Sequence, residues 1–157
     1  MTRFNLMPVL ALAILTLVPT AAAQQQSISG YVVYVPGDAT DFALADGRTL
    51  SNGALRGVLI EDDPESPIHL VSQNCAGTDL FGSDGTPIQS AGSCTGIDGD
   101  GDLYHVSYLN SPEQRPWSFT GGTGKFAGIE GGGTTEVVAV GPDGRVTIRY
   151  EGTMRTR

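Results

Sequence analysis

Apolar residues in this chain alternate with polar ones in short runs, and glycine-containing turn sequences bound most of the runs. Tyr104, Val106 and Tyr108 occupy every second position, and the run 145–151 repeats the pattern. This period of two is typical of a strand with one face in a core and one in water. No segment after residue 23 shows the apolar stripe of a helix of ten or more residues, and glycine and proline are frequent there. The pattern therefore predicts an all-β domain.

Turn signals divide this domain into many short strands. The chain contains 22 glycines, and six of them follow Asp or Asn in dipeptides that favour tight turns. These dipeptides are Asp46-Gly47, Asn52-Gly53, Asp84-Gly85, Asp98-Gly99, Asp100-Gly101 and Asp143-Gly144. Strands are predicted at 28–35, 41–45, 54–61, 67–74, 77–81, 92–97, 103–109, 115–120, 124–130, 133–140 and 145–151. Short strands at this spacing favour a barrel or sandwich, and closure into a barrel also hides the sheet edges.

The first 23 residues have the composition of a signal peptide. Arg3 precedes an apolar stretch from Leu6 to Val18, and Ala21 to Ala23 form a small-residue cleavage site. A membrane anchor is the alternative, but the stretch is shorter than the ~20 residues that cross a bilayer, and no basic cluster follows it. We therefore expect cleavage after Ala23, no membrane anchor, and a single exported domain of residues 24–157 that is secreted or periplasmic.

The charge of the chain disfavours a nucleic-acid partner. Seventeen acidic residues outnumber nine basic ones, and the formal net charge is −8. A field of this sign repels phosphate backbones and anionic membrane surfaces. Basic residues do not cluster beyond the pair Arg155 and Arg157. The acidity is most simply a solubility feature.

The chain has two cysteines, Cys75 and Cys94. In an oxidising compartment, two cysteines close together in an antiparallel sheet are usually bridged. Closing the loop between them would stabilise the fold by about 3 kcal/mol. A catalytic thiol is one alternative, and a zinc site that includes His69 and His105 is another, although this spacing lacks the close ligand pairs of structural zinc sites. We predict a disulfide, no metal and no cofactor.

Two local motifs allow a ligand-binding interpretation. Asp98, Asp100 and Asp102 are spaced like the first ligands of a calcium loop, but Leu103 and Leu109 stand where that loop needs glycine and glutamate. A polar hairpin turn is the preferred interpretation, with weak calcium binding as the alternative. The glycine-rich segment 121–128 lacks the hydroxyl residue of a Walker loop and the helix of a dinucleotide loop, so both phosphate-binding interpretations are rejected.

The same glycine-rich segment carries a family resemblance. The residues from Trp117 to Gly128, WSFTGGTGKFAG, resemble the Gly-Gly-Thr-Gly-x-Phe signature of allene oxide cyclases and dirigent proteins. The stretch from Cys75 to Asp102 is similar to uncharacterised bacterial secreted proteins of the same superfamily. The resemblance implies an eight-stranded antiparallel calycin-like barrel, often trimeric in the plant relatives, so a homo-oligomer is an expectation. It implies a turn and close strand packing for the signature glycines, and it assigns no catalytic residues here.

We consider three functions. The leading hypothesis is a barrel that binds a small apolar or aromatic ligand, although an eight-stranded barrel can also be packed solid with the same side chains. The candidate lining residues are Tyr104, His105, Tyr108, Trp117, Phe119 and Phe126. The second is an isomerase or cyclase-type enzyme acting on a small hydrophobic substrate, with a buried polar group such as His105, Glu130 or Glu136. The third is a non-catalytic structural or interaction protein.

Overall fold

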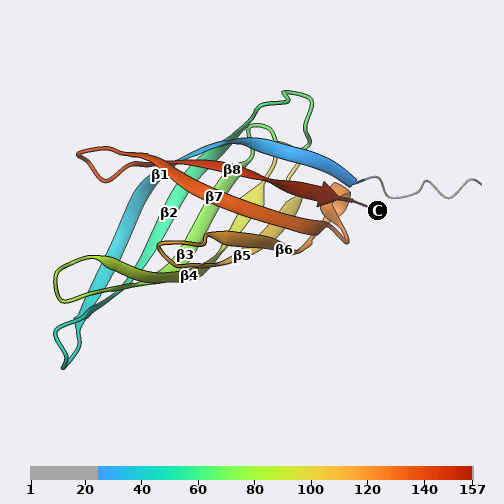
Figure 1. The fold of residues 1–157 in the computed structure, drawn as a ribbon. Helices are drawn as coiled ribbons and strands as arrows, with labels where there is room; N and C mark the ends of the chain where they lie inside the picture. The colour runs from blue at the N-terminus through green and yellow to red at the C-terminus, as the bar shows by residue number, and fades with distance from the viewer. Residues whose placement is uncertain (1–24, 157) are drawn as a thin grey trace, which may run out of the picture.

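The computed structural model describes residues 25–156, which form a closed, eight-stranded antiparallel barrel (Figure 1). Each strand pairs with the next, and β1 closes the barrel against β8 over the register from Gln25↔Arg155 to Tyr34↔Val146. The all-β barrel prediction is confirmed, whereas the predicted signal peptide lies outside the described residues. The elements are β1 (Gln25–Ala43), β2 (Thr49–Glu61), β3 (Ser72–Phe81), β4 (Pro87–Ile97), β5 (Leu103–Asn110), β6 (Pro116–Gly122), η1 (Gly124–Phe126), β7 (Glu130–Val140) and β8 (Val146–Arg155).

One type of turn closes four of the hairpins. A glycine adopts φ between +81° and +87° in the turns β1–β2, β3–β4, β4–β5 and β7–β8, at Gly47, Gly85, Gly101 and Gly144. In the first, the Asp46 carboxylate accepts a hydrogen bond of 3.2 Å from the Arg48 backbone N–H. These turns confirm the prediction from the aspartate-glycine dipeptides. The predicted turn at Asn52-Gly53 is wrong, because this dipeptide lies inside β2, where Gly53 pairs with Gly77.

Two predicted strand boundaries are wrong near β1 and β3. β1 is one long strand, because a register shift between Pro36 and Ala39 lets its pairing with β2 continue. The predicted strand 67–74 is mostly a series of turns, and β3 begins only at Ser72. Prolines at 64 and 67 cannot donate backbone hydrogen bonds to a strand ladder, which favours turns in this segment.

The predicted strand 124–130 is also wrong, because its first half closes one end of the barrel. The segment forms the short 3-10 helix η1 and a turn, with Gly124 at φ +51° and Gly128 at +69°. Phe126 is fully buried there, in a core cluster that includes Ile68, Val71 and Met154. Burial of this aromatic ring under the barrel outweighs the period-two pattern that favoured a strand.

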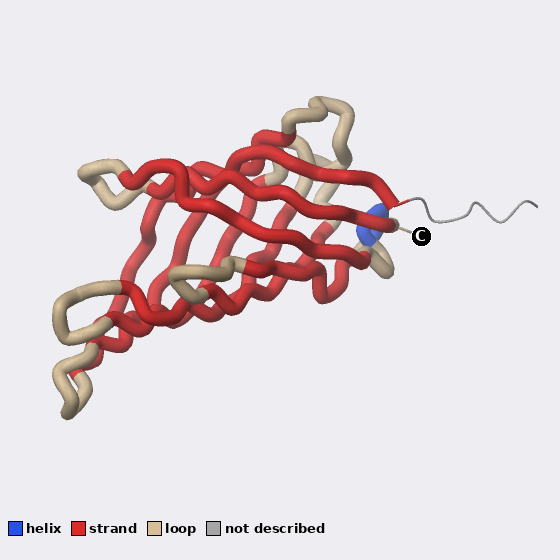
Figure 2. Tube along the Cα trace, in the orientation of Figure 1, coloured by secondary structure: helices blue, strands red, loops and turns tan. Residues whose placement is uncertain are grey.

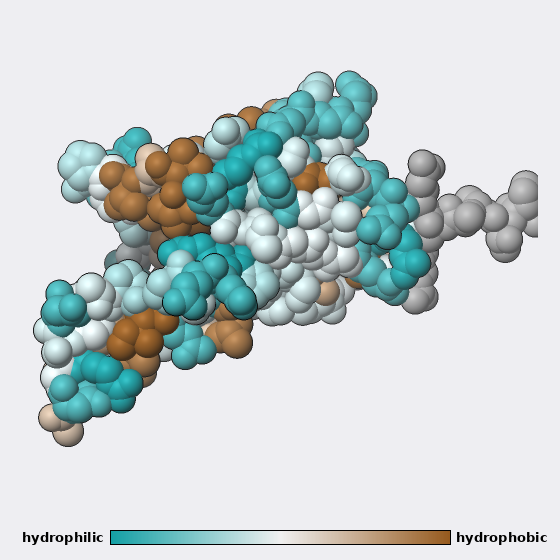
Figure 3. Space-filling view, viewed as in Figure 1, coloured by the Kyte–Doolittle hydropathy of each residue, from teal (hydrophilic) through white to brown (hydrophobic). Residues whose placement is uncertain are grey.

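The two ends of the barrel are different. η1 and the chain end after β8 lie at one end, and the hairpins β1–β2, β3–β4, β5–β6 and β7–β8 lie at the other (Figure 2). Apolar side chains gather on the surface at the hairpin end over β7 and β8, where Val138 and Val140 are exposed (Figure 3). Within residues 25–156, no helix is both long and apolar enough to span a membrane.

Candidate functional site

An apolar cavity of about 640 Å³ extends through the barrel to the hairpin end. Its volume is within the range of small-molecule sites. Val32, Leu59 and Val106 are among its aliphatic wall residues, and Phe81 and Val140 line it near the hairpins. The cavity therefore has the size and surface chemistry to enclose one small apolar molecule.

The cavity stays open because aromatic side chains lie over glycines of the neighbouring strand. Tyr104 pairs in register with Gly96, and a Cβ atom on that glycine would lie 2.2 Å from the tyrosine ring. Three other tyrosine-glycine pairs share this arrangement: Tyr34 with Gly57, Tyr108 with Gly92, and Tyr150 with Gly30. Each ring can lie along the wall, since its partner has no side chain. The centre of the barrel is left unfilled.

Replacing Gly96 by alanine should lower the free energy of unfolding by about 1–3 kcal/mol, the usual cost of overpacking. The three nearest atoms to the new methyl group all belong to Tyr104, so that ring must move toward the cavity. Urea denaturation measures the loss. Gly99→Ala is the matched control, because no atom lies within 4 Å of its Cβ position. Equal stability of the two variants would contradict the packing of rings over glycines.

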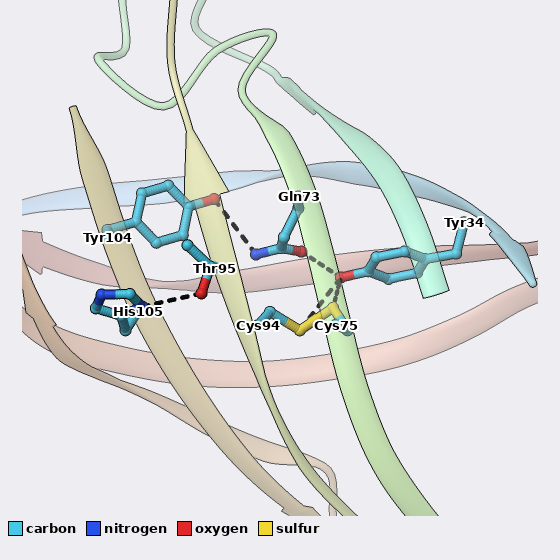
Figure 4. The surroundings of a disulfide bond; sticks show 7 residues. All are labelled: Tyr34, Gln73, Cys75, Cys94, Thr95, Tyr104 and His105. Atoms are coloured by element: carbon cyan, nitrogen blue, oxygen red, sulfur yellow. Dashed lines mark hydrogen bonds between the residues drawn. A yellow bond between two sulfur atoms is a disulfide. The ribbon is translucent and has the colours of Figure 1, made fainter. Parts of the chain in front are cut away.

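The predicted disulfide is confirmed, and it lies in the cavity wall (Figure 4). Cys75 on β3 pairs directly with Cys94 on β4, and both are buried. The sulfur atoms lie 3.4 Å and 4.0 Å from the hydroxyl oxygen of Tyr34. Because both sulfurs are bonded to each other, neither is available as a catalytic thiol or zinc ligand.

Tyr34, Gln73 and Tyr104 form a polar row beside the disulfide, which we call the inner polar row (Figure 4). The Tyr34 hydroxyl donates to the side-chain oxygen of Gln73, and the Gln73 amide nitrogen donates to the Tyr104 hydroxyl at 3.3 Å. All three side chains are buried and line the cavity. Burial raises the pKa of both tyrosines, so their hydroxyls remain protonated at neutral pH.

A buried carboxyl group lies behind another wall tyrosine. The Tyr150 hydroxyl donates to Glu61 over 2.7 Å, and Glu61 is only 5% exposed. Desolvation by burial raises the pKa of Glu61, although the hydrogen bonds from Tyr150 and the Ser29 backbone N–H oppose the shift. Burial also raises the pKa of Tyr150. The pair is therefore the one place in the described residues where a buried acid contacts the cavity wall.

Replacing Glu61 by glutamine should stabilise the protein at pH 8 but leave its stability nearly unchanged at pH 4. The raised pKa means that the folded state holds the Glu61 proton more tightly than the unfolded state does. Stability from this group is therefore complete below the unfolded pKa and is lost as the pH rises through the folded pKa. A tenfold difference in proton affinity between the two states corresponds to about 1.4 kcal/mol. Urea denaturation at both pH values, with exposed Glu113→Gln as control, tests this. An equal gain at both pH values would contradict it.

The structure places the six predicted lining residues in three locations. Tyr104, Tyr108, Trp117 and Phe119 line the cavity. Phe126 instead packs beneath it in the closed end, where its ring meets Tyr104 edge to face. His105 is exposed on the outer face, within 3.0 Å of the Thr95 hydroxyl. The odd and even positions of β5 face opposite sides, so His105 could not share the tyrosine face.

The predicted buried polar groups are also corrected. Glu130 and Glu136 are exposed on the outer face of β7, and Glu130 forms an ion pair with Arg155. The buried polar side chains of the site are instead Glu61 and Gln73. The alternation of inward and outward positions along a strand could have identified both residues. Glu61 is two residues after Leu59, and Gln73 is two residues before Cys75, so each faces the interior with its neighbour.

The acidic run 98–102 binds the side chain of Lys125. The Lys125 ammonium lies 2.6 Å from Asp98 and 3.2 Å from Asp100, and the Lys125 backbone N–H donates to Asp102. Hydrogen bonding and charge attraction from Lys125 lower the pKa of Asp98. The run therefore fastens η1 to the β4–β5 turn, and Lys125 contacts all three of the aspartates that the calcium alternative would use.

Among solved structures, two dirigent proteins share this barrel. The pterocarpan synthase dirigent protein GePTS1 superposes with a TM-score of 0.55 at 15% identity, over 94% of this chain and 97% of that chain. The pterocarpan synthase dirigent protein PsPTS1 gives 0.51 at 19% identity, over 85% and 96%. No family model and no curated protein matches the chain. The allene oxide cyclase part of the resemblance stays a prediction. The chain has the fold of the dirigent proteins.

Proposed function

We propose that this protein is an exported barrel that binds a small apolar or aromatic molecule in its cavity. The observation that carries the proposal is the open apolar interior, lined by rings that lie over glycines. Folded proteins rarely leave such volume empty, because unfilled space forfeits dispersion contacts. The solved neighbours are named as pterocarpan synthases, which associates this barrel with small organic molecules in those proteins.

Export is part of the same proposal. The leader-like composition of residues 1–23 supports it, and so does the Cys75–Cys94 disulfide, since such bonds persist in oxidising compartments. Mass spectrometry of the protein recovered from the periplasm or medium should find Gln24 as the first residue. Recovery of an uncleaved chain from the membrane fraction would favour the anchor instead.

A fluorescent apolar dye tests ligand binding directly. N-phenyl-1-naphthylamine should increase its fluorescence in the cavity and raise the melting temperature in proportion to the logarithm of its concentration. Ile148→Trp should weaken this binding, because Ile148 lines the cavity and the larger ring occupies part of it. Thr147→Trp is the matched control, since its side chain faces the opposite side of β8 from the cavity residue Ile148.

The dye experiment also separates the proposal from a purely structural role. A structural barrel needs no empty interior, and the cavity argues against the solid packing that such a role allows. If the dye neither fluoresces nor stabilises the protein, or if Ile148→Trp and Thr147→Trp bind it equally, ligand binding in the cavity is wrong.

An isomerase or cyclase-type enzyme is the second candidate, favoured by the pair Glu61 and Tyr150. A buried carboxyl group with a raised pKa can exchange a proton with a ligand through the tyrosine hydroxyl that it contacts. Such a role needs the Glu61 pKa to lie above that of an ordinary glutamate. Titration of Glu61 by carbon-13 NMR measures it, and an ordinary or lowered value would remove this candidate.

A further inference from the structure

The inner polar row contains more polar hydrogens than its own hydrogen bonds use. Its two tyrosine hydroxyls and one carboxamide carry four polar hydrogens, and two hydrogen bonds consume two of them. Within residues 25–156, no acceptor is placed for the Tyr104 hydroxyl hydrogen or for the second hydrogen of the Gln73 amide nitrogen. Exchanging the oxygen and nitrogen of Gln73 would move the unused hydroxyl hydrogen to Tyr34 without changing the count.

Unused donors at this depth are energetically costly. Gln73 is 6% exposed and Tyr104 is 1% exposed, and a buried donor without an acceptor costs roughly 1–3 kcal/mol. Apolar and aromatic groups surround the row, including the disulfide sulfurs and the ring of Phe119. An acceptor atom brought in by a ligand would remove the cost.

The charges near the row determine which acceptor fits. Among the described residues that line the cavity, Arg115 is the only basic one, and it lies in the connection between β5 and β6 at the hairpin end. Acidic groups stand at two places in the wall: Asp79 lines the cavity, and Glu61 accepts a hydrogen bond from Tyr150. An anionic group placed at the row would meet this negative charge with no cation to compensate for it. A neutral oxygen carries no such penalty.

We propose that the inner polar row binds a neutral acceptor oxygen, such as a ketone, lactone or aromatic ether oxygen, of an otherwise apolar ligand. This inference rests on the proposed function, because it assumes a ligand in the cavity. Gln73 and Tyr104 donate to the oxygen, and the aromatic walls hold the apolar body. The row is thus the specificity-determining part of the cavity: it orients the ligand with its oxygen toward the closed end.

Two probes of nearly equal shape test the inference. 2-Acetylnaphthalene carries a carbonyl oxygen where 2-isopropenylnaphthalene carries a methylene group. The ratio of their dissociation constants is measured in the wild type, in Tyr104→Phe and in Tyr31→Phe. Tyr31 carries the same hydroxyl group but is 40% exposed and does not line the cavity, so Tyr31→Phe is the matched control. Gln73→Leu serves as a second variant if Tyr104→Phe folds poorly.

We expect Tyr104→Phe to reduce the preference for the ketone about fivefold, the effect of losing one neutral hydrogen bond. Tyr31→Phe should leave the preference unchanged. The infrared carbonyl stretch of bound 2-acetylnaphthalene should lie at lower frequency in the wild type than in Tyr104→Phe. If both probes bind but neither the ratio nor the stretch changes, the inference is wrong and the proposed function stands. If neither probe binds, the inference and the proposed function are both wrong.

Discussion

Phe126→Ala should lower the free energy of unfolding by about 3–5 kcal/mol, the usual cost of removing a buried aromatic ring. Phe126 is fully buried in the closed end, and its ring contacts Tyr104 edge to face with centroids 5.4 Å apart. Neighbouring backbone limits collapse into the space, because η1 is fastened by Lys125 to Asp98. Urea denaturation at pH 7 measures the effect.

Phe42→Ala is the matched control for this prediction. The same ring is removed, but Phe42 is 49% exposed near the end of β1, so the loss should stay within about 0.5 kcal/mol. At temperatures where Phe126→Ala remains folded, it should still bind the naphthylamine dye, since Phe126 is not part of the cavity wall. Similar losses in the two variants would mean that η1 does not close the barrel as described.

Replacing both Cys75 and Cys94 by alanine should lower the free energy of unfolding by about 3 kcal/mol on the chain-entropy model. The disulfide restricts the unfolded chain, whereas the folded barrel is held by strand pairing all around its circumference. Far-UV circular dichroism should therefore keep its β signature in the variant. Urea denaturation should show the midpoint moving to a lower concentration.

The reduced wild-type protein provides an independent control for this double variant. Denaturation in the presence of a reductant should reproduce most of the loss, because reduction removes the same cross-link without changing a side chain volume. A stability equal to that of the oxidised wild type, in either the variant or the reduced protein, would show that the cross-link does not stabilise the barrel.

Local patterns predicted much of the fold because their causes are local. The alternation around Tyr104 and Val106 reflects the pleat of one strand, and the aspartate-glycine turns reflect the backbone freedom of single residues. The same reasoning failed at 124–130. There the chain's own pattern favours a strand, but burial of Phe126 beneath the barrel requires a compact turn.

The candidate site was predicted in part. Tyr104, Tyr108, Trp117 and Phe119 line the cavity, because the alternation along each strand decides which face a side chain takes. Their role in binding a ligand stays a prediction. Gln73 was missed, although its parity with Cys75 indicated an inward side chain. The misplacement of strand boundaries near 67–74 obscured that signal.

The amino-acid sequence by itself determined the all-β class, the tight turns, the facing of most side chains and the two cysteines that pair. Only the tertiary structure decided whether the barrel is open or solid. That outcome depends on which residues stand opposite one another across strands, such as Tyr34 with Gly57 and Tyr104 with Gly96. Register between strands is a property of the closed sheet, and a glycine makes room for a ring only once that register exists.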